Sequence, residues 1–173
     1  MLRLWMRYWK QAHINKLSDS KVKKVKTDKP AGDSSEQREA EKRLLDAFSR
    51  KLGVTLTQNK EFKLDGGSRI ELDGFCESPL ILCEAWAHIG LAKGAQLHKV
   101  MADALRLLFV NKVFFEGKGE LVLLFADYDA AKRFEGESWR AQCLEKYNIK
   151  VKVIELPSKI KAKVQKAQKR QKR

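Results

Sequence analysis

The fold class of this chain can be inferred from residues 69–87, RIELDGFCESPLILCEAWA. Over residues 68–75, apolar and polar side chains alternate, which predicts a strand with one buried face. A turn at residues 77–79 separates this strand from residues 80–87, an apolar run that only Glu84 interrupts. Two strands joined by a short turn form an antiparallel hairpin, so this segment predicts the hairpin of a sheet.

Patterns on both sides of the hairpin extend the prediction to a whole domain. The expected elements are a helix over 35–52, a strand over 54–57 that leads into 61–64, a helix over 95–110, a strand over 120–126, helical structure over 127–146 interrupted at Gly136, and an edge strand over 150–156. This order predicts an α/β fold, a three-layer domain over residues 36–156 with a mixed central sheet flanked by helices.

Helical periodicity also predicts which side chains each helix buries. In the first helix, Leu44, Leu45, Phe48 and Leu52 form an apolar stripe, and one turn earlier this stripe reaches Glu41. In the helix over 95–110, the expected buried face is Leu97, Val100, Met101, Ala104, Leu105 and Leu108. The expected polar side of that helix is Gln96, Lys99, Asp103 and Arg106.

The charge of the chain lies at its two ends. The 173 residues carry a net charge of +14, of which residues 1–35 contribute +6, residues 157–173 contribute +8, and residues 36–156 contribute none. Basic arms around a neutral body favour a polyanion partner, most simply nucleic acid. The alternative is that lysine-rich ends only keep the protein in solution. The candidate nucleic-acid-binding residues of the C-terminal tail are Lys159, Lys161, Lys163, Lys166, Lys169, Arg170, Lys172 and Arg173.

The same composition argues against several other classes of protein. No run of 18 apolar residues is present, so the sequence predicts no membrane span. Three cysteines without C-x-x-C spacing argue against a disulfide scaffold and a cysteine-rich zinc site. We therefore expect a cytoplasmic protein. The tail over 157–173 has little reason to be ordered alone, although it could become helical on a phosphate backbone.

Residues 1–17, MLRLWMRYWKQAHINKL, combine aromatic and basic side chains. Arg3 and Arg7 interrupt the apolar centre that a secretory signal requires. Three interpretations remain open: an amphipathic helix that contacts a membrane surface, a segment that docks on a protein partner, or a start site placed upstream of the true protein. Residues 18–35 have the composition of a linker.

Two acidic residues of the hairpin are candidates for chemistry. Asp73 ends the first strand and Glu84 lies inside the second, at positions that can face each other across the ladder. A carboxylate in an apolar strand costs several kcal/mol unless a cation compensates it. Mg²⁺ uses hard oxygen ligands of this kind. The structural alternatives are that Asp73, which precedes a glycine, is a turn residue, and that Glu84 pairs with a buried base.

Two motifs on these strands resemble those of the PD-(D/E)xK nuclease superfamily, namely Glu71-Leu72-Asp73-Gly74 and Glu84-Ala85-Trp86. The order of the expected helices and strands also resembles that superfamily, which has a restriction-endonuclease-like fold. The resemblance covers residues 36–156. It implies that Asp73 and Glu84 bind Mg²⁺, or Mn²⁺ in its place, and that Glu41 adds to the metal shell, with Glu39 a poorer candidate. The implied activity is hydrolysis of phosphodiester bonds in DNA, with RNA a weaker alternative.

The sequence departs from the superfamily at the motif lysine, because Trp86 stands where the lysine would be. Some members supply this cation from the following helix, where Lys99 is the candidate here. Gln96, on the same polar side of that helix, is a further candidate catalytic residue. The structural alternative for Lys99 is an ion pair with Asp103. Two other functions also stay open: a catalytically inactive nucleic-acid-binding module of the same fold, and an interaction protein that uses residues 1–17. A homodimer is a further open expectation.

Overall fold

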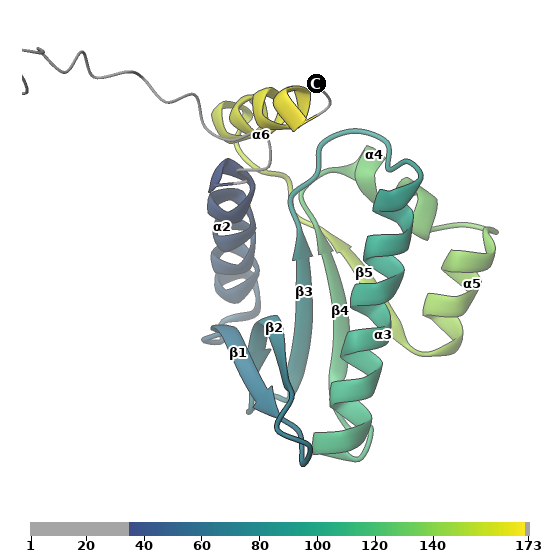
Figure 1. Ribbon diagram of the computed structural model, residues 1–173. Coiled ribbons are helices and arrows are strands. Elements are labelled where there is room, and N and C mark those ends of the chain that lie inside the picture. Colours follow the sequence, from purple (N-terminus) through teal and green to yellow (C-terminus); the bar gives the residue numbers. More distant parts are fainter. Residues whose placement is uncertain (1–34, 172–173) are drawn as a thin grey trace, which may run out of the picture. The chain divides into compact units, whose positions relative to one another are not determined.

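The computed structural model describes residues 35–171, so the expectations for residues 1–34 and for Lys172 and Arg173 lie outside the described residues. Figure 1 shows the arrangement of the helices and strands. In chain order they are α2 (Ser35–Leu52), β1 (Thr57–Lys63), β2 (Arg69–Cys76), β3 (Ile81–Trp86), α3 (Ala95–Phe115), β4 (Glu120–Phe125), α4 (Tyr128–Ala131), the 3-10 helix η1 (Lys132–Phe134), α5 (Trp139–Lys146), β5 (Ile149–Val153) and α6 (Ser158–Gln171).

The five strands form one mixed sheet in the order β1-β2-β3-β4-β5. β1, β2 and β3 pair antiparallel, whereas β3, β4 and β5 run parallel. The parallel pairing of β3 with β4 requires a crossover connection, which α3 provides. The predicted hairpin over 69–87 is therefore confirmed as β2 and β3, and β3 is the central strand.

Helices cover both faces of the sheet, which confirms the three-layer α/β architecture. Because side chains alternate along a strand, β3 sends Leu82 and Trp86 into a core formed with α3, α4, η1 and α5. The same strand sends Cys83 and Ala85 into a second core formed with α2 and α6. Every residue of β3 is buried, as expected of a strand covered on both faces.

Several element boundaries differ from those predicted. α3 continues to Phe115 and ends where Glu116 adopts a left-handed conformation, with φ of 56°. Residues 127–146 contain two short helices followed by α5, which begins after Ser138 because the Ser138 hydroxyl accepts a hydrogen bond from the Ala141 N–H. The predicted interruption at Gly136 falls in the gap between η1 and α5.

The buried face of α3 is rotated relative to the prediction. Leu105, predicted to be buried, is 66% exposed, whereas Asp103, predicted to be on the polar side, is one of the buried charged residues. The buried stripe includes Val100, Ala104 and Leu107. Asp103 tolerates burial because its carboxylate receives two cationic side chains of its own helix, Lys99 and Arg106. Apolar periodicity alone could not reveal this ion-pair network.

The compact unit continues beyond residue 156, where the sequence analysis had ended the domain. Residues 158–171 form α6, and its Ile160, Val164 and Ala167 side chains are buried. Ile160 and Val164 lie in the same core as α2, and Arg170 of α6 pairs with Glu36 of α2 at 2.9 Å. The C-terminal basic segment is therefore a packed helix and part of the domain.

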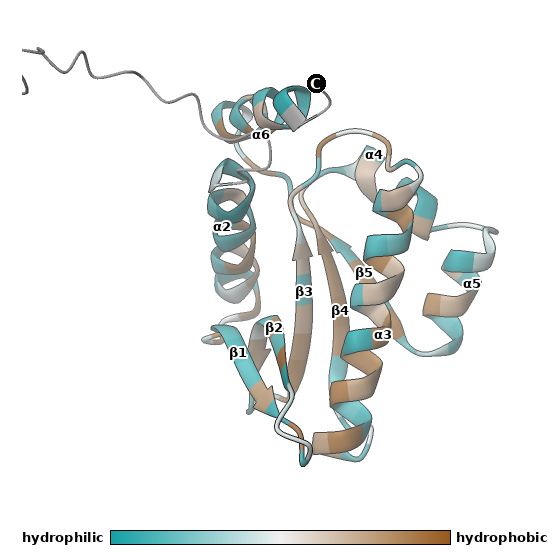
Figure 2. Cartoon of the chain, viewed as in Figure 1, coloured by the Kyte–Doolittle hydropathy of each residue, from teal (hydrophilic) through white to brown (hydrophobic). Residues whose placement is uncertain are grey.

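Hydrophilic residues recur along the helices, as Figure 2 shows, including the long helix α3. Within residues 35–171, no helix combines the length and the apolar character that crossing a membrane requires. In Figure 2, the central strands β3 and β4 are largely brown, and helices cover both of their faces.

Gly74 in β2 is required by close packing, which makes it the first testable position. A Cβ atom at Gly74 would lie 2.5 Å from Sγ of Cys83 and 2.8 Å from Cδ2 of Leu45. We therefore expect Gly74→Ala to lower the free energy of unfolding by about 1–3 kcal/mol, measured by urea denaturation. Gly66→Ala is the control, since a Cβ at Gly66 meets no atom within 4 Å. Equal stability of the two variants would contradict this packing.

Candidate functional site

The site lies where β2 leaves β3. The two strands pair from Gly74 with Cys83 to Cys76 with Ile81, and one further step of this register places Asp73 opposite Glu84. At that step the Asp73 side chain replaces the backbone ladder, because its Oδ2 accepts a hydrogen bond from the Ala85 N–H at 2.8 Å. The backbone pairing of β2 with β3 therefore ends at Gly74, and the Asp73 carboxylate makes the next hydrogen bond between the two strands.

The other side of β2 is also irregular at this position. The register with β1 pairs Gln58 with Gly74 and Lys60 with Leu72, and it passes over Asn59 and Asp73. Asn59 has φ of 52°, in the left-handed region that asparagine tolerates better than most residues. The sheet is therefore locally distorted at Asp73, as is common beside functional groups.

Glu84 is a buried acid at the centre of the sheet. Its side chain is only 4% exposed, and Oε1 accepts a hydrogen bond from Nη1 of Arg106 at 2.9 Å. Burial raises the pKa of Glu84 to about 9, and the negative charge of Asp73 and a hydrogen bond with it act in the same direction. Arg106 opposes this shift. Glu84 therefore lies beside Asp73, as the hairpin predicted, and pairs with a base, as the structural alternative predicted.

Glu41 reaches the same site from α2. Burial raises the pKa of Glu41 to about 7, with the negative charge of Asp73 as the next cause. Its carboxyl also interacts with the Lys99 ammonium and the backbone of Ala87, and it accepts a hydrogen bond from Gln37. The structure thus brings Glu41 into electrostatic contact with Asp73. Glu39, the poorer candidate, pairs instead with Arg43 at 3.0 Å.

Lys99 contributes a cation from α3. Its Nζ lies 3.1 Å from Oδ2 of Asp103, which is the ion pair considered as the structural alternative. Burial acts to lower the pKa of Lys99, but the carboxylates of Asp103, Glu41 and Asp73 together raise it. Lys99 is therefore paired with Asp103 and also oriented toward the two acids of the site.

Gln96 is directed elsewhere. Its Nε2 lies 3.2 Å from Nδ1 of His88, and its Oε1 accepts a hydrogen bond from the Lys93 N–H at 3.0 Å. His88 stacks on Trp86 with ring centroids 4.8 Å apart, and Gln168 of α6 lies 2.7 Å from its Nδ1. Gln96 therefore orders the loop after β3, and Trp86 packs against His88.

Sequence reasoning did not assign a site role to Arg106, Asp103 or Gln168. A signal existed for the first two, because Lys99, Asp103 and Arg106 recur at helical spacing on one side of α3. No signal existed for Gln168, which binds the Ile89 backbone through both its amide oxygen and its amide nitrogen across 79 residues of sequence.

The donor set fits a magnesium or manganese ion held by few protein ligands. Within the described part of the chain, no three His, Cys, Asp or Glu side chains form a group able to hold a metal. Mg²⁺ commonly takes only one or two carboxylates from a protein and completes its shell with water and phosphate oxygens. Asp73 and Glu84 supply two such carboxylates. The pKa of Glu84 is raised first by burial and then by the negative charge of Asp73, and a divalent cation would neutralise that charge.

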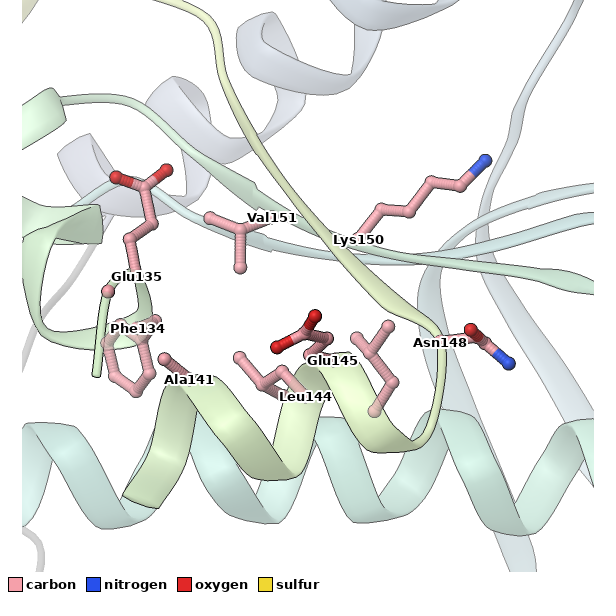
Figure 3. A pocket seen from close by; sticks show the side chains of 10 residues that line it. Phe134, Glu135, Ala141, Leu144, Glu145, Asn148, Lys150 and Val151 are labelled. Atoms are coloured by element: carbon pink, nitrogen blue, oxygen red, sulfur yellow. The ribbon is translucent and has the colours of Figure 1, made fainter. Parts of the chain in front are cut away.

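A separate pocket lies between η1, α5 and β5. Its volume is about 470 Å³, and Figure 3 shows Phe134, Leu144 and Val151 lining it together with Glu145 and Lys150. None of the three acids of the site lines this pocket. We place the candidate site at Asp73, Glu84 and Glu41, because there acids from three different elements converge and two of them have a strongly raised pKa.

The basic residues of α6 divide into two groups. Lys161 is largely buried and pairs with Asp127 and Glu155, so it holds α6 to the domain. Arg170 pairs with Glu36, and Lys163 lies 3.9 Å from Glu39. The remaining three lysines of the predicted set are exposed on the helix, namely Lys159, Lys166 and Lys169.

Comparison with protein-family models, with curated proteins and with solved structures found no match for this chain. A proposal about function therefore depends on the geometry and the chemistry of the site and on the motif resemblance.

The raised pKa values of Glu84 and Glu41 predict how stability depends on pH without divalent cations. Both exceed the ordinary value of 4.5, so between pH 4.5 and about 9 the folded protein holds protons that the unfolded chain has released. Stability should therefore fall as the pH rises through this range. We expect Glu84→Gln to remove up to one proton from this dependence, about 1.4 kcal/mol per pH unit.

Urea denaturation in EDTA across pH 5–9 measures this dependence. Glu71→Gln is the control because Glu71 is an exposed acid of the neighbouring strand β2. A Glu84→Gln protein that keeps the pH dependence of the wild type would show that Glu84 does not carry the raised pKa.

Proposed function

We propose that this protein is a divalent-metal-dependent nuclease of the PD-(D/E)xK type, which hydrolyses phosphodiester bonds in DNA in preference to RNA. One observation carries the proposal. Glu41, Asp73, Glu84 and Lys99 come from four different elements, and they interact electrostatically at the point where β2 leaves β3. The three-layer α/β architecture with a mixed sheet agrees with the restriction-endonuclease-like fold that the motif resemblance implies.

The roles follow from the chemistry of each group. Asp73 and Glu84 would hold Mg²⁺ or Mn²⁺, and Glu41, which interacts electrostatically with Asp73, would reach the metal through water. A metal held there would activate a water molecule and neutralise charge that develops on phosphorus. Lys99 would take the part of the missing motif lysine, because its ammonium interacts electrostatically with Asp73 and Glu41 from the helix that follows β3. Gln96 orders the neighbouring loop.

Nucleic acid is the partner that the charge favours. The exposed Lys159, Lys166 and Lys169 of α6 present cations on a helix that packs against the domain, and they can contact a phosphate backbone without reading its sequence. α6 is also linked to the loop after β3, since Gln168 binds Ile89 and His88. This link places the basic helix and the loop of the site in one rigid assembly.

A second function, a catalytically inactive nucleic-acid-binding module, is favoured by one specific observation. Glu84 is sealed from solvent and already paired with Arg106, and Trp86 occupies the motif lysine position. In this alternative the ion pair is purely structural. Peripheral membrane contact through residues 1–17, a homodimer and a cytoplasmic location remain predictions of the sequence.

Cleavage assays with isosteric variants test the first function. Purified protein is incubated with supercoiled, linear and single-stranded DNA in Mg²⁺ or Mn²⁺. We expect Asp73→Asn and Glu84→Gln to reduce the cleavage rate at least about 100-fold, because each removes a carboxylate that would hold the metal. Glu71→Gln, an exposed acid on β2, should cleave as the wild type does. Wild-type protein that binds DNA but leaves every substrate intact would support the inactive module instead.

The salt dependence of DNA binding tests α6. Each phosphate contact that is lost should reduce the slope of log affinity against log salt concentration by about 1. We therefore expect replacement of Lys159, Lys166 and Lys169 by Gln to lower the slope by about 2–3, measured by fluorescence anisotropy in EDTA. Lys112→Gln with Lys118→Gln is the comparison, since both lysines are exposed away from α6. An unchanged slope in the α6 variant would exclude this helix from the interface.

A further inference from the structure

We propose that Arg106 occupies the place of the divalent cation on Glu84 in the cation-free protein, and that cation binding displaces its guanidinium from this carboxylate. The inference rests on the proposed metal site and identifies a positioning residue that the motif resemblance does not include. In this proposal, Arg106 holds the buried Glu84 carboxylate in position whenever no metal is bound.

Arg106 and Glu84 are unequal partners. The Glu84 side chain is 4% exposed and fixed in the central strand, whereas the Arg106 side chain is 40% exposed and extends from α3. An ion pair between a buried acid and a flexible base can open only by movement of the base. The guanidinium is therefore the group that a competing cation would displace.

Asp103 gives the displaced guanidinium a second anchor. Nη1 of Arg106 lies 3.3 Å from Oδ1 of Asp103, in addition to its 2.9 Å contact with Glu84. After loss of the Glu84 contact, Arg106 keeps an acid partner one turn away on its own helix. Displacement therefore costs one hydrogen bond and does not leave the guanidinium without a counter-ion.

The charges around the site also favour a divalent cation. Four carboxylates, those of Glu41, Asp73, Glu84 and Asp103, interact with two cations, Lys99 and Arg106. When all six groups are ionised, the cluster carries two uncompensated negative charges. Arg106 satisfies only Glu84 and Asp103 by direct contact, so the negative potential at Asp73 and Glu41 remains for a second cation to neutralise.

Competition for one carboxylate must be reciprocal. If the guanidinium and the metal exclude each other on Glu84, removing the guanidinium should tighten metal binding by the same factor by which the metal weakens the ion pair. A purely structural Arg106 predicts the opposite, because its loss would leave the Glu84 carboxyl without its hydrogen-bond partner and weaken the site.

Mn²⁺ binding to the full chain tests this, measured by calorimetry and by electron paramagnetic resonance of free Mn²⁺ at pH 8. We expect Arg106→Gln to bind Mn²⁺ about tenfold more tightly than the wild type. Lys112→Gln is the matched control for charge, since it removes an exposed cation of the same helix, and it should leave the affinity unchanged.

A measurement on the wild type covers the case in which Arg106→Gln does not fold. In protein labelled with ¹⁵N-arginine, Mg²⁺ should shift the guanidinium resonance that Arg106→Lys removes, while the other arginine signals keep their positions.

The outcomes separate this inference from the proposed nuclease activity. Tighter Mn²⁺ binding by Arg106→Gln supports the inference even if no substrate is cleaved. Equal affinities of Arg106→Gln and wild type, weaker binding by Arg106→Gln, or an Arg106 resonance that Mg²⁺ leaves unchanged would overturn it while cleavage by the wild type stands. Absence of Mn²⁺ binding in every variant would overturn both proposals.

Discussion

A carboxylate in the central strand of a sheet must find a positive charge, and Arg106 provides it for Glu84. This contact crosses from β3 to α3 at 2.9 Å. Asp103 lies in the buried layer of α3, and Leu105 is exposed to solvent. The rotation of the longest helix therefore buries Val100, Ala104 and Leu107 and also brings Arg106 to Glu84.

The same constraint shapes the sheet beside Glu84. Asp73 and Glu84 cannot both be ionised side by side without cost, and the strands separate there, with the Asp73 carboxylate bonded to the Ala85 N–H. Glu41 and Lys99 then approach the opened position from α2 and α3. Ionisable side chains from α2, β2, β3 and α3 therefore converge beside the two acids. Such convergence is common at functional sites.

Much of the fold follows from local patterns. The helix over 35–52, the hairpin over 69–87, and the strand beginning at 120 were predicted because their periodicity and turn residues agree with their tertiary environment. Helix ends were less predictable, since the end of α3 depends on the left-handed conformation of Glu116, which its residue type does not require. The packing of α6 was missed because three buried residues among many lysines give a weak apolar signal.

For the site, the sequence by itself determined that two acids lie on adjoining strands and that the motif lysine is replaced by Trp86. These are properties of residue type and spacing, which a hairpin converts directly into proximity. Only the tertiary structure decided that Glu41 and Lys99 join the acids, that Gln96 does not, and that Arg106 is the counter-ion of Glu84. The physical reason is that the rotation of a helix against a sheet depends on all the groups it buries, including charged ones whose partners lie far away in the chain.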